Sequence, residues 1–325
     1  MAYLVQKFGG TSVATLERIQ KVARKVLAAR QSGLDVVVVV SAMAKETDRL
    51  LQLAQSFSNS PNLKEVDVVA ATGETVAAAL TALAIQAEGG KACSLLGFQL
   101  PILTDSLASQ ARILEVKNAR LLACFQQGEI PVVAGFQGIT ADGRVTTLGR
   151  GGSDTTAVAI AASLGARCEI YTDVDGVFSA DPRICSDAVL LPQVSYRFML
   201  EAAELGAKVM HNRSVEIGMR HEVPLYVRNS FSDADGTQIS QRDTLVNCVA
   251  LRAESDVAKV SLVGQVDPDP SRRIAGVLSL LSHRKIQCHG LSRGDLSLSF
   301  LVSQNRSLEA VHLLHSLCRP ALEVH

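Results

Sequence analysis

The chain has 325 residues, of which 47% are hydrophobic and 20% are charged, and its 32 basic residues balance its 32 acidic ones. This length and composition describe a globular protein with room for one large domain and one small one. Zero net charge without a basic stripe argues against a nucleic-acid partner. Aromatic residues make up only 4% and Trp is absent, so we expect an aliphatic core.

Strand and helix signals alternate from the start of the chain. Five consecutive valines at residues 36–40 are typical of a parallel strand that helices cover on both faces. Asp142-Gly143 indicates a hairpin turn. The alternation predicts an α/β sandwich. We expect strands at about 4–8, 36–40, 92–96, 130–136, 168–172 and 224–227, and helices after residue 10 and at about 47–57, 66–87, 112–127, 155–164 and 195–219.

A polar, turn-rich stretch at residues 230–244 is the candidate linker between two domains. The remaining pattern is βαββαβ, the order of a ferredoxin-like module. We therefore expect one domain at residues 1–245 and another at residues 246–325. The elements of the second domain are predicted at 257–264, 271–284, 286–291, 296–303, 307–318 and 321–324.

The cysteines and the N-terminus bear on the cell compartment. The seven cysteines are an odd number, and no two have CxxC spacing, so we interpret them as buried thiols in a reducing cytoplasm. The histidines show no metal-ligand spacing, and we expect no resident metal. The N-terminus has no signal segment, and the apolar stretch at residues 66–87 carries Asp67 and Glu74, which argues against a membrane partner.

Lys7, Gly9 and Gly10 lie between a predicted strand and a predicted helix. Glycines let the backbone approach an anion closely, and a helix N-terminus offers unpaired N–H groups and a partial positive charge. Lys7 adds a cation, so the segment suits a phosphate, although a glycine turn beside a solvated lysine is the alternative. Thr11 or Ser12 is expected to cap the helix.

A second glycine-rich helix start surrounds Arg150 and Asp154. Arginine grips a carboxylate or a phosphate with two hydrogen bonds. The alternative is a capped loop with Ser153 or Asp154 as the N-cap, and both interpretations can hold together.

Asp173, Asp175 and Asp181 are close in sequence but lack the later ligands of a calcium loop. A loop at the carboxyl end of a strand suits a nucleotide instead, and Arg183 could reach its phosphates. Glu74 sits in an apolar helix, where a carboxylate is costly unless paired. It is therefore either an exposed or capping residue or a fixed anion that receives an ammonium group. Lys208 is a candidate second cation over the phosphates.

Together these segments resemble the aspartate kinases of the amino acid kinase superfamily over about residues 2–245. The resemblance implies an amino acid kinase-like three-layer αβα sandwich as the catalytic domain, followed by a ferredoxin-like ACT domain for regulation or dimerisation. The matching motifs are KFGGTSV at 7–13, SAM at 41–43, TGE at 72–74, GFQG at 135–138, TTLGRGGSDTTA at 146–157, YTDVDGV at 171–177, ADPR at 180–183 and GAKVMH at 206–211.

The implied reaction moves the γ-phosphoryl group of ATP, bound with Mg²⁺, to the side-chain carboxylate of L-aspartate. That carboxylate has a pKa of ~3.9 and is already ionised, so charge neutralisation and alignment must supply the catalysis. The partners would be L-aspartate, ATP and a second copy of the chain in a homodimer. A kinase of another amino acid carboxylate and a catalytically silent amino-acid sensor remain alternatives.

By position, the resemblance assigns roles to individual residues. Glu74 takes the substrate α-ammonium group, Arg150 clamps a substrate carboxylate, and Asp154 organises Lys7. The catalytic set is Lys7, Asp154 and Lys208. The substrate-binding set is Ser41, Thr47, Glu74, Arg150, Gly151, Gly152 and Ser153. The nucleotide-binding set is Lys7, Phe8, Gly9, Gly10, Thr172, Asp173, Phe178, Ser179, Ala180, Asp181, Pro182, Arg183 and Lys208.

Three features depart from the family pattern. Thr75-Val76-Ala77 follows the glutamate where a basic residue or Gln and then a Ser are common, and Gln99-Leu100-Pro101 replaces the usual QAG. Residues 246–325 leave room for one ACT module where most members carry two. We therefore expect weakened or absent feedback inhibition by lysine or threonine.

Overall fold

The computed structural model describes residues 2–207, 209–243, 246–264 and 270–318. The chain forms two compact units, Met1–Asp175 with Glu216–Asp235, and Gly176–Val215 with Gly236–His325. These units have other bounds than the two predicted domains, and the domain boundary at residue 245 stays a prediction.

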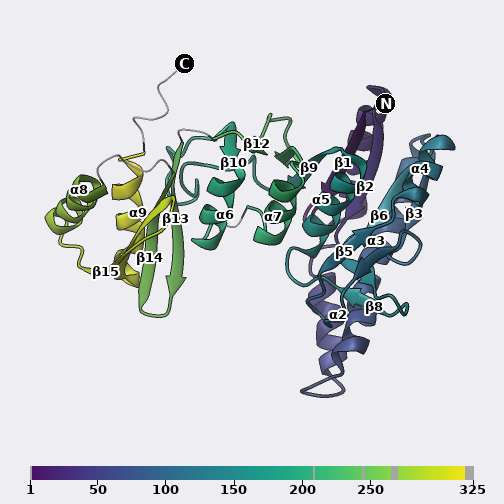
Figure 1. Cartoon of the computed structure of the whole chain (residues 1–325), viewed down its shortest axis with the longest axis horizontal. Coiled ribbons are helices and arrows are strands. Elements are labelled where there is room, and N and C mark those ends of the chain that lie inside the picture. The colour runs from purple at the N-terminus through teal and green to yellow at the C-terminus, as the bar shows by residue number, and fades with distance from the viewer. Residues whose placement is uncertain (1, 208, 244–245, 265–269, 319–325) are drawn as a thin grey trace. The chain divides into compact units, whose positions relative to one another are not determined.

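The first unit is an α/β structure whose elements alternate along the chain (Figure 1). They are β1 (Tyr3–Phe8), α1 (Leu16–Gln31), β2 (Asp35–Val40), α2 (Glu46–Gln55), α3 (Leu63–Ala87), β3 (Ala92–Leu95), β4 (Ile102–Thr104), β5 (Ile113–Val116), α4 (Ala119–Gln126), β6 (Ile130–Ala134), β7 (Gln137–Ile139), β8 (Val145–Thr147), α5 (Gly152–Leu164), β9 (Arg167–Thr172) and β11 (Leu225–Asn229).

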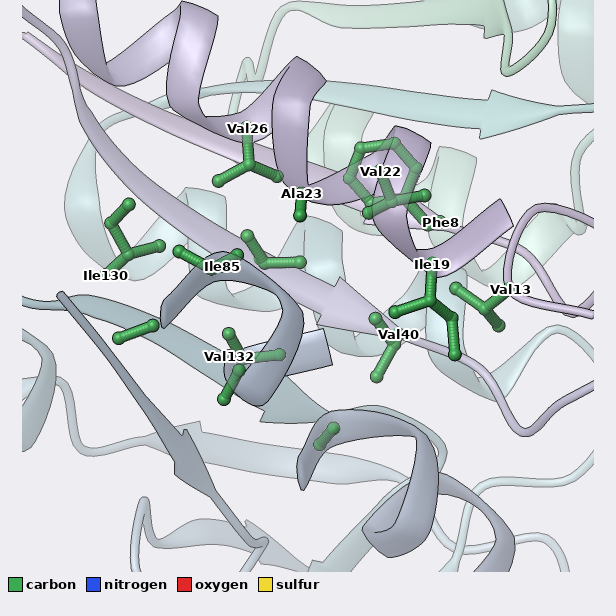
Figure 2. Close-up of a cluster of buried hydrophobic side chains, with 14 of the residues drawn as sticks. Phe8, Val13, Ile19, Val22, Ala23, Val26, Val40, Ile85, Ile130 and Val132 are labelled. Carbon is green, nitrogen blue, oxygen red and sulfur yellow. The ribbon is translucent and has the colours of Figure 1, made fainter. Parts of the chain in front are cut away.

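Strands β11, β9, β1, β2, β6 and β3 lie side by side in that order, and each pairs with its neighbours in parallel. Residues Val36, Val38 and Val40 of β2 belong to a core cluster that α1 and α3 complete (Figure 2). Val37 and Val39 point to the opposite face and are equally buried. On that face α5 contacts β1, β2 and β9, and α4 contacts β6. The predicted three-layer αβα sandwich is confirmed.

The core of this unit is aliphatic, as the composition predicts. Figure 2 shows side chains of α1, β2, α3 and β6 pointing toward one another, among them Val26, Val40, Ile85 and Val132. Fully burying one such side chain contributes about 1.5–3 kcal/mol. The five valines of β2 are each at most 1% exposed, which makes β2 the centre of the sandwich.

Helix α3 crosses this unit and carries two charged residues into it. By length and composition it is the one helix among the described residues that could span a membrane. However, half of its apolar window is buried, and it packs on α1, α2 and four strands. Asp67 and Glu74 within it are buried as well. These contacts are those of a core helix.

A second, smaller sheet in the first unit has the strand order β5-β4-β7-β8. The β7–β8 hairpin confirms the turn expected at Asp142-Gly143, where Gly143 has a φ of 86°. The helix expected at about 112–127 is wrong in its first half, because Ile113–Val116 forms β5 and pairs with β4. Tertiary pairing here overrides the helix propensity of Leu114 and Glu115.

Both predicted helix caps in the first unit are wrong. Thr15, not Thr11 or Ser12, caps α1, and its hydroxyl accepts a hydrogen bond from the N–H of Arg18. Helix α5 begins at Gly152, and its N-cap is Gly151 with a φ of 72°. A left-handed conformation suits glycine, so this helix starts without a side-chain cap. Ser153 and Asp154 lie in its first turn instead.

The second unit carries a small antiparallel sheet with the order β13-β14-β16-β15. Its elements are β10 (Gln193–Ser195), α6 (Tyr196–Glu204), β12 (Thr237–Ser240), β13 (Asn247–Glu254), β14 (Val257–Gly264), α8 (Pro270–His283), β15 (Cys288–Arg293), β16 (Ser297–Ser303), the 3₁₀ helix η1 (Gln304–Arg306) and α9 (Ser307–His315). Helix α7 (Asn212–Arg220) spans the boundary between the units in sequence.

Three predictions for this part of the chain need correction. The helix expected at 195–219 is two helices, α6 and α7. The linker at 230–244 contains β12, which pairs in parallel with β10 and buries Thr237 and Ile239. Strand β13 was not expected, yet it pairs with β14 along its whole length. The strand predicted at 321–324 lies outside the described residues.

Candidate active site

A cavity of about 550 Å³ opens at the carboxyl ends of β1 and β2. Its volume is typical of a small-molecule site, and the carboxyl edge of a parallel sheet is the usual place for one. Lys7 comes from β1, Ser41 follows β2, and Glu74 comes from α3. The predicted site residues that line this one cavity are Lys7, Gly10, Ser41, Thr47, Glu74, Arg150, Gly151, Gly152, Ser153 and Asp154.

Lys7 and Asp154 form an ion pair at the base of the cavity. The ammonium nitrogen of Lys7 lies 2.6 Å from Oδ1 of Asp154, and the two side chains are only 10% and 15% exposed. Asp154 lies in the first turn of α5, where the helix dipole favours a negative charge. The pair therefore holds a lysine that is largely screened from water at a fixed position in the cavity.

Glu74 is a buried carboxylate with one oxygen satisfied. Its Oε1 accepts a hydrogen bond of 3.0 Å from the N–H of Ala42, and its buried Oε2 has no hydrogen-bond partner among the described residues. Burial raises the pKa of Glu74 to about 7, although the Ala42 N–H and the charge of Lys7 oppose this rise. A cation in the cavity would satisfy Oε2 and stabilise the ionised form.

The two glycines after β1 bring the backbone close to its neighbours. A Cβ atom on Gly10 would lie 2.8 Å from the carbonyl oxygen of Ala42, so a larger residue would push the two strand ends apart. The N–H of Gly9 donates to the carbonyl oxygen of Tyr171. Phe8 points into the core, where its ring stacks on that of Tyr171 at 4.8 Å. Neither Phe8 nor Gly9 lines the cavity, although both were predicted to bind the nucleotide.

Arg150 occupies the loop between β8 and α5, and its side chain is exposed. Gly149 and Gly151 on either side have φ values of 73° and 72°, a region that favours glycine. The loop therefore turns tightly and presents the arginine at the wall of the cavity. A guanidinium group in this place can bind a carboxylate of a ligand.

Three further cavity residues have a strained backbone that the sequence does not signal. Lys45, Ser109 and Phe136 have φ values of 67°, 64° and 69°, and all three line the cavity. Left-handed conformations cost energy for residues other than glycine and gather at functional sites. Lys45 also precedes α2 without a side-chain cap.

Asp67 supports the cavity wall from behind and was missed as a site residue. It is fully buried in α3, and its carboxylate accepts hydrogen bonds from the N–H and hydroxyl of Ser109 and from the hydroxyl of Thr147. Arg144 lies 3.7 Å from the same carboxylate. Both Ser109 and Thr147 line the cavity. A carboxylate within an apolar helix is the sequence signal that could have identified it.

The predicted nucleotide-binding residues do not all lie at the cavity. Thr172 ends β9, and its hydroxyl donates to the exposed Asp173 at 3.1 Å. Residues 178–183 belong to the second unit, where Ser179 and Ala180 are buried and Arg183 pairs with Asp181 at 2.6 Å. The exposed Pro182 lies between them, and Phe178 bridges to Leu190. Lys208 lies outside the described residues.

Comparison with known proteins supports the resemblance seen in the motifs. The sequence profile of the amino acid kinase family matches residues 2–229. An aspartokinase of Geobacillus stearothermophilus is 48% identical over 268 residues, which cover 81% of this chain and 66% of that protein. The chain thus spans about two thirds of the length of this relative.

Solved structures give the same result. The aspartate kinase of Synechocystis superposes with a TM-score of 0.68 and 31% identity, over 97% of this chain and 69% of that one. Aspartokinase III of Escherichia coli, in complex with aspartate and ADP, has a TM-score of 0.70 over 98% of this chain and 84% of its own, and its 24% identity supports the fold alone. The chain therefore belongs to the amino acid kinase family. Within that family it groups with the aspartate kinases, which confirms the predicted family.

Proposed function

We propose that the chain transfers the γ-phosphoryl group of ATP to the side-chain carboxylate of L-aspartate, giving 4-phospho-L-aspartate and ADP. The observation that carries this proposal is the single cavity lined by an ion-paired lysine, a half-satisfied buried glutamate and an exposed arginine. The aspartokinase of Geobacillus stearothermophilus and the aspartate kinase of Synechocystis support the choice of aspartate.

Glu74 and Arg150 are proposed to hold the two ends of the amino acid. The substrate ammonium group would donate to Oε2 of Glu74, the oxygen for which the described part of the chain supplies no hydrogen-bond donor. The guanidinium of Arg150 would bind the α-carboxylate, and Ser41 and Thr47 would add hydroxyl contacts from the same cavity. This arrangement leaves the side-chain carboxylate directed toward the phosphate site.

The Lys7–Asp154 pair is proposed to serve the phosphoryl group. One oxygen of the substrate carboxylate attacks the γ-phosphorus, an O–P bond forms, and the bond from that phosphorus to the β,γ-bridging oxygen breaks. The electron pair of the broken bond leaves with ADP, and no proton transfer is needed. Lys7, fixed by Asp154 at 2.6 Å, would neutralise charge on the transferred group.

The glycines and the metal complete the phosphate site in this proposal. Gly10 lacks a side chain where a Cβ would crowd the carbonyl oxygen of Ala42, and Gly9 beside it also leaves the backbone open to a polyphosphate. We assign Gly151, Gly152 and Ser153, at the N-terminus of α5, to the substrate-binding part of the same cavity. Mg²⁺ would arrive bound to ATP and supply further positive charge at the phosphates, and we assign it no protein ligand.

The remaining parts of the nucleotide would be held beyond the cavity. We propose that Thr172 and Asp173 at the end of β9, residues 178–183 and Lys208 contact ATP. We also propose a cytoplasmic homodimer in which residues 246–325 form the regulatory or dimerisation domain. Light scattering of the purified chain tests the dimer, and a monomer at all concentrations would contradict it.

Release of ADP, coupled to NADH oxidation, tests the proposed reaction. The assay compares L-aspartate with L-glutamate, which is longer by one methylene, and with succinate, which lacks the ammonium group that Glu74 would bind. We expect turnover with L-aspartate and at least tenfold lower kcat/KM with either analogue. Equal or better turnover with L-glutamate would identify a different acceptor, and no acceptor-dependent ADP with any of them would indicate a sensor instead of a kinase.

A further inference from the structure

Four side chains that commonly bind metals meet in the second unit, and the proposed kinase reaction uses none of them. Cys185 and Asp187 lie in the segment before β10. His312 and His315 lie three residues apart on α9, so they share one face of that helix. The thiol, the carboxylate and two imidazoles form a mixed sulfur, oxygen and nitrogen set that suits zinc.

The ligand atoms of three of these residues, Cys185, Asp187 and His315, lie close enough together for one tetrahedral ion, and His312 lies beside Cys185. In a tetrahedral zinc site with bonds of about 2.0–2.3 Å, neighbouring ligand atoms lie about 3.3–3.8 Å apart. The Cys185 sulfur lies 3.5 Å from Nδ1 of His312, and Nδ1 of His315 lies 3.5 Å from Oδ1 of Asp187. Ligand atoms of Cys185, Asp187 and His315 all fall within 4.8 Å of one another. A distance of 3.5 Å is long for a hydrogen bond between nitrogen and oxygen, but it fits two ligands of one ion.

A buried hydroxyl orients one of the imidazoles. The Ser179 hydroxyl oxygen lies 2.9 Å from Nε2 of His315 and also accepts the N–H of Val189 at 2.9 Å. When Nε2 of His315 carries the proton and donates it to Ser179, Nδ1 presents its lone pair toward Cys185 and Asp187. Outer hydrogen bonds of this kind fix the ring and tautomer of histidines that bind metals.

Two of the four side chains are buried and two are exposed, so a metal ion can reach the group from solvent. Cys185 and His315 are buried, while Asp187 and His312 are exposed. The buried pair would hold the ion and the exposed pair would close over it, His312 by rotation at the surface. The contacts of His315 with Ser179 and Asp187 also resemble a hydrolase triad. The Ser179 side chain is fully buried, however, and its hydroxyl oxygen already contacts His315 and the N–H of Val189, so it is not available as a nucleophile.

We propose a zinc site in the second unit whose ligands are the clustered Cys185, Asp187 and His315, with His312, which lies beside Cys185, turning in as the fourth ligand. The ion ties the segment before β10 to α9, two parts of the chain that otherwise meet through the hydrophobic cluster around Ala180 and Cys185. Its role is structural, because all four protein ligands are used and no position remains for a substrate.

Zinc titration of the full-length chain tests this site. The chain is first stripped with a chelator, and its affinity for Zn²⁺ alone is measured by competition with a chromophoric zinc chelator. We expect one ion per chain. His312→Gln removes a ligand at the surface without disturbing the core, and we expect it to weaken binding at least as much as the about 10–100-fold typical of lost outer-shell partners. The matched control is His221→Gln, another exposed histidine, with no expected change.

The absorption spectrum of bound Co²⁺ distinguishes metal binding at this site from binding at a second cysteine cluster. Cys93, Cys124 and Glu129 also lie close together in the first unit, with the two sulfurs 3.4 Å apart. Co²⁺ bound through Cys185 gives a thiolate charge-transfer absorption, which we expect Cys185→Ser to abolish and Cys93→Ser to retain. The proposal is overturned if His312→Gln binds zinc like the unchanged chain, or if the absorption survives in Cys185→Ser.

Discussion

The cavity at the carboxyl ends of β1 and β2 and the Cys185 cluster of the second unit both gather polar groups, but by different means. The cavity is built from strand ends and helix starts, and glycines bring backbone atoms together there. The cluster is built from side chains alone, on one segment and one helix. The charged groups of the cavity are therefore accessible to a small-molecule ligand, whereas the side chains of the cluster can coordinate one metal ion.

The two regions also differ in how burial acts on their charged groups. In the cavity, burial raises the pKa of Glu74 to about 7, and the carboxylate keeps an oxygen without a partner. Asp67, equally buried in the same helix, is surrounded by donors. Helix α3 thus carries two carboxylates with different roles: Asp67 supports the cavity wall through its hydrogen bonds, and Glu74 is suited to bind a ligand.

Removal of Asp67 should have the largest effect on stability. Asp67→Ala leaves the donors of Ser109, Thr147 and Arg144 without their buried acceptor, and we expect a loss of about 3–5 kcal/mol in the free energy of unfolding. Asp67→Asn keeps an acceptor and should lose less. Urea denaturation measures both, with exposed Asp256→Ala as the control. Equal stability of all three variants would show that Asp67 does not support the wall.

Removal of Lys7 should have the largest effect on turnover. Loss of one fixed donor to the transition state typically costs about 2.7–4 kcal/mol, or about 10²–10³ in kcat. We expect this loss for Lys7→Ala, and a similar loss for Asp154→Ala because Lys7 then has no anchor. Steady-state kinetics measure both against Lys21→Ala, an exposed lysine of α1. Near-normal kcat in Lys7→Ala would refute the phosphate assignment.

Replacement of Glu74 should raise the stability of the chain and lower its affinity for aspartate. Its pKa rises from 4.5 in the unfolded chain to about 7, so the free energy of unfolding falls as pH rises through that interval. Above pH 7 this costs about 3 kcal/mol, at 1.36 kcal/mol per pKa unit. Glu74→Gln removes this cost, so at about pH 8 we expect a more stable chain, by up to about 3 kcal/mol, that binds aspartate more weakly.

Thermal unfolding and aspartate titration, each over about pH 5–8, measure the two effects of Glu74→Gln. Exposed Glu65→Gln on the same helix serves as the control and should show neither effect. A Glu74→Gln variant with the pH dependence of the unchanged chain would mean that Glu74 is not the group that titrates. An unchanged affinity for aspartate would exclude it as the ammonium site.

Arg150→Ala should have the smallest of these effects, and it should act on binding. A hydrogen bond to a charged group contributes about 1.5–3 kcal/mol, which corresponds to about a 10–100-fold rise in the KM for aspartate. We expect kcat to change little, because Arg150 does not contact the transferred group in the proposal. Arg120→Ala on α4 is the exposed control. A large loss in kcat with unchanged KM would move Arg150 to the phosphates.

Much of the fold could be predicted because its sheet is parallel and buried. The five valines of β2 have no solvent-facing side, which indicates a central strand without further information. Strand β5 could not be predicted in this way, since Leu114 and Glu115 favour a helix and only pairing with β4 makes them a strand. Strand β12 was mistaken for a linker because its buried Thr237 is polar, and its hydroxyl donates to the carbonyl of Leu191.

More residues of the cavity than of the Cys185 cluster could be predicted, because the cavity contains local sequence motifs. Lys7 and Arg150 lie in glycine-rich turns, and these turns are visible as local sequence. Ligands that come together only by folding give no such signal: Cys185 and His312 are 127 positions apart. The strained backbone of Phe136 is also invisible in sequence, because tertiary packing imposes it.

The identity of the product tests the central claim most directly. An acyl phosphate on the aspartate side chain reacts with hydroxylamine to give the aspartate hydroxamate, which mass spectrometry identifies. With ATP, Mg²⁺ and L-aspartate, the account predicts this hydroxamate in an amount equal to the ADP released, and almost none from Lys7→Ala. Release of ADP without the hydroxamate would contradict it, because the carboxylate of aspartate would then not be the phosphoryl acceptor.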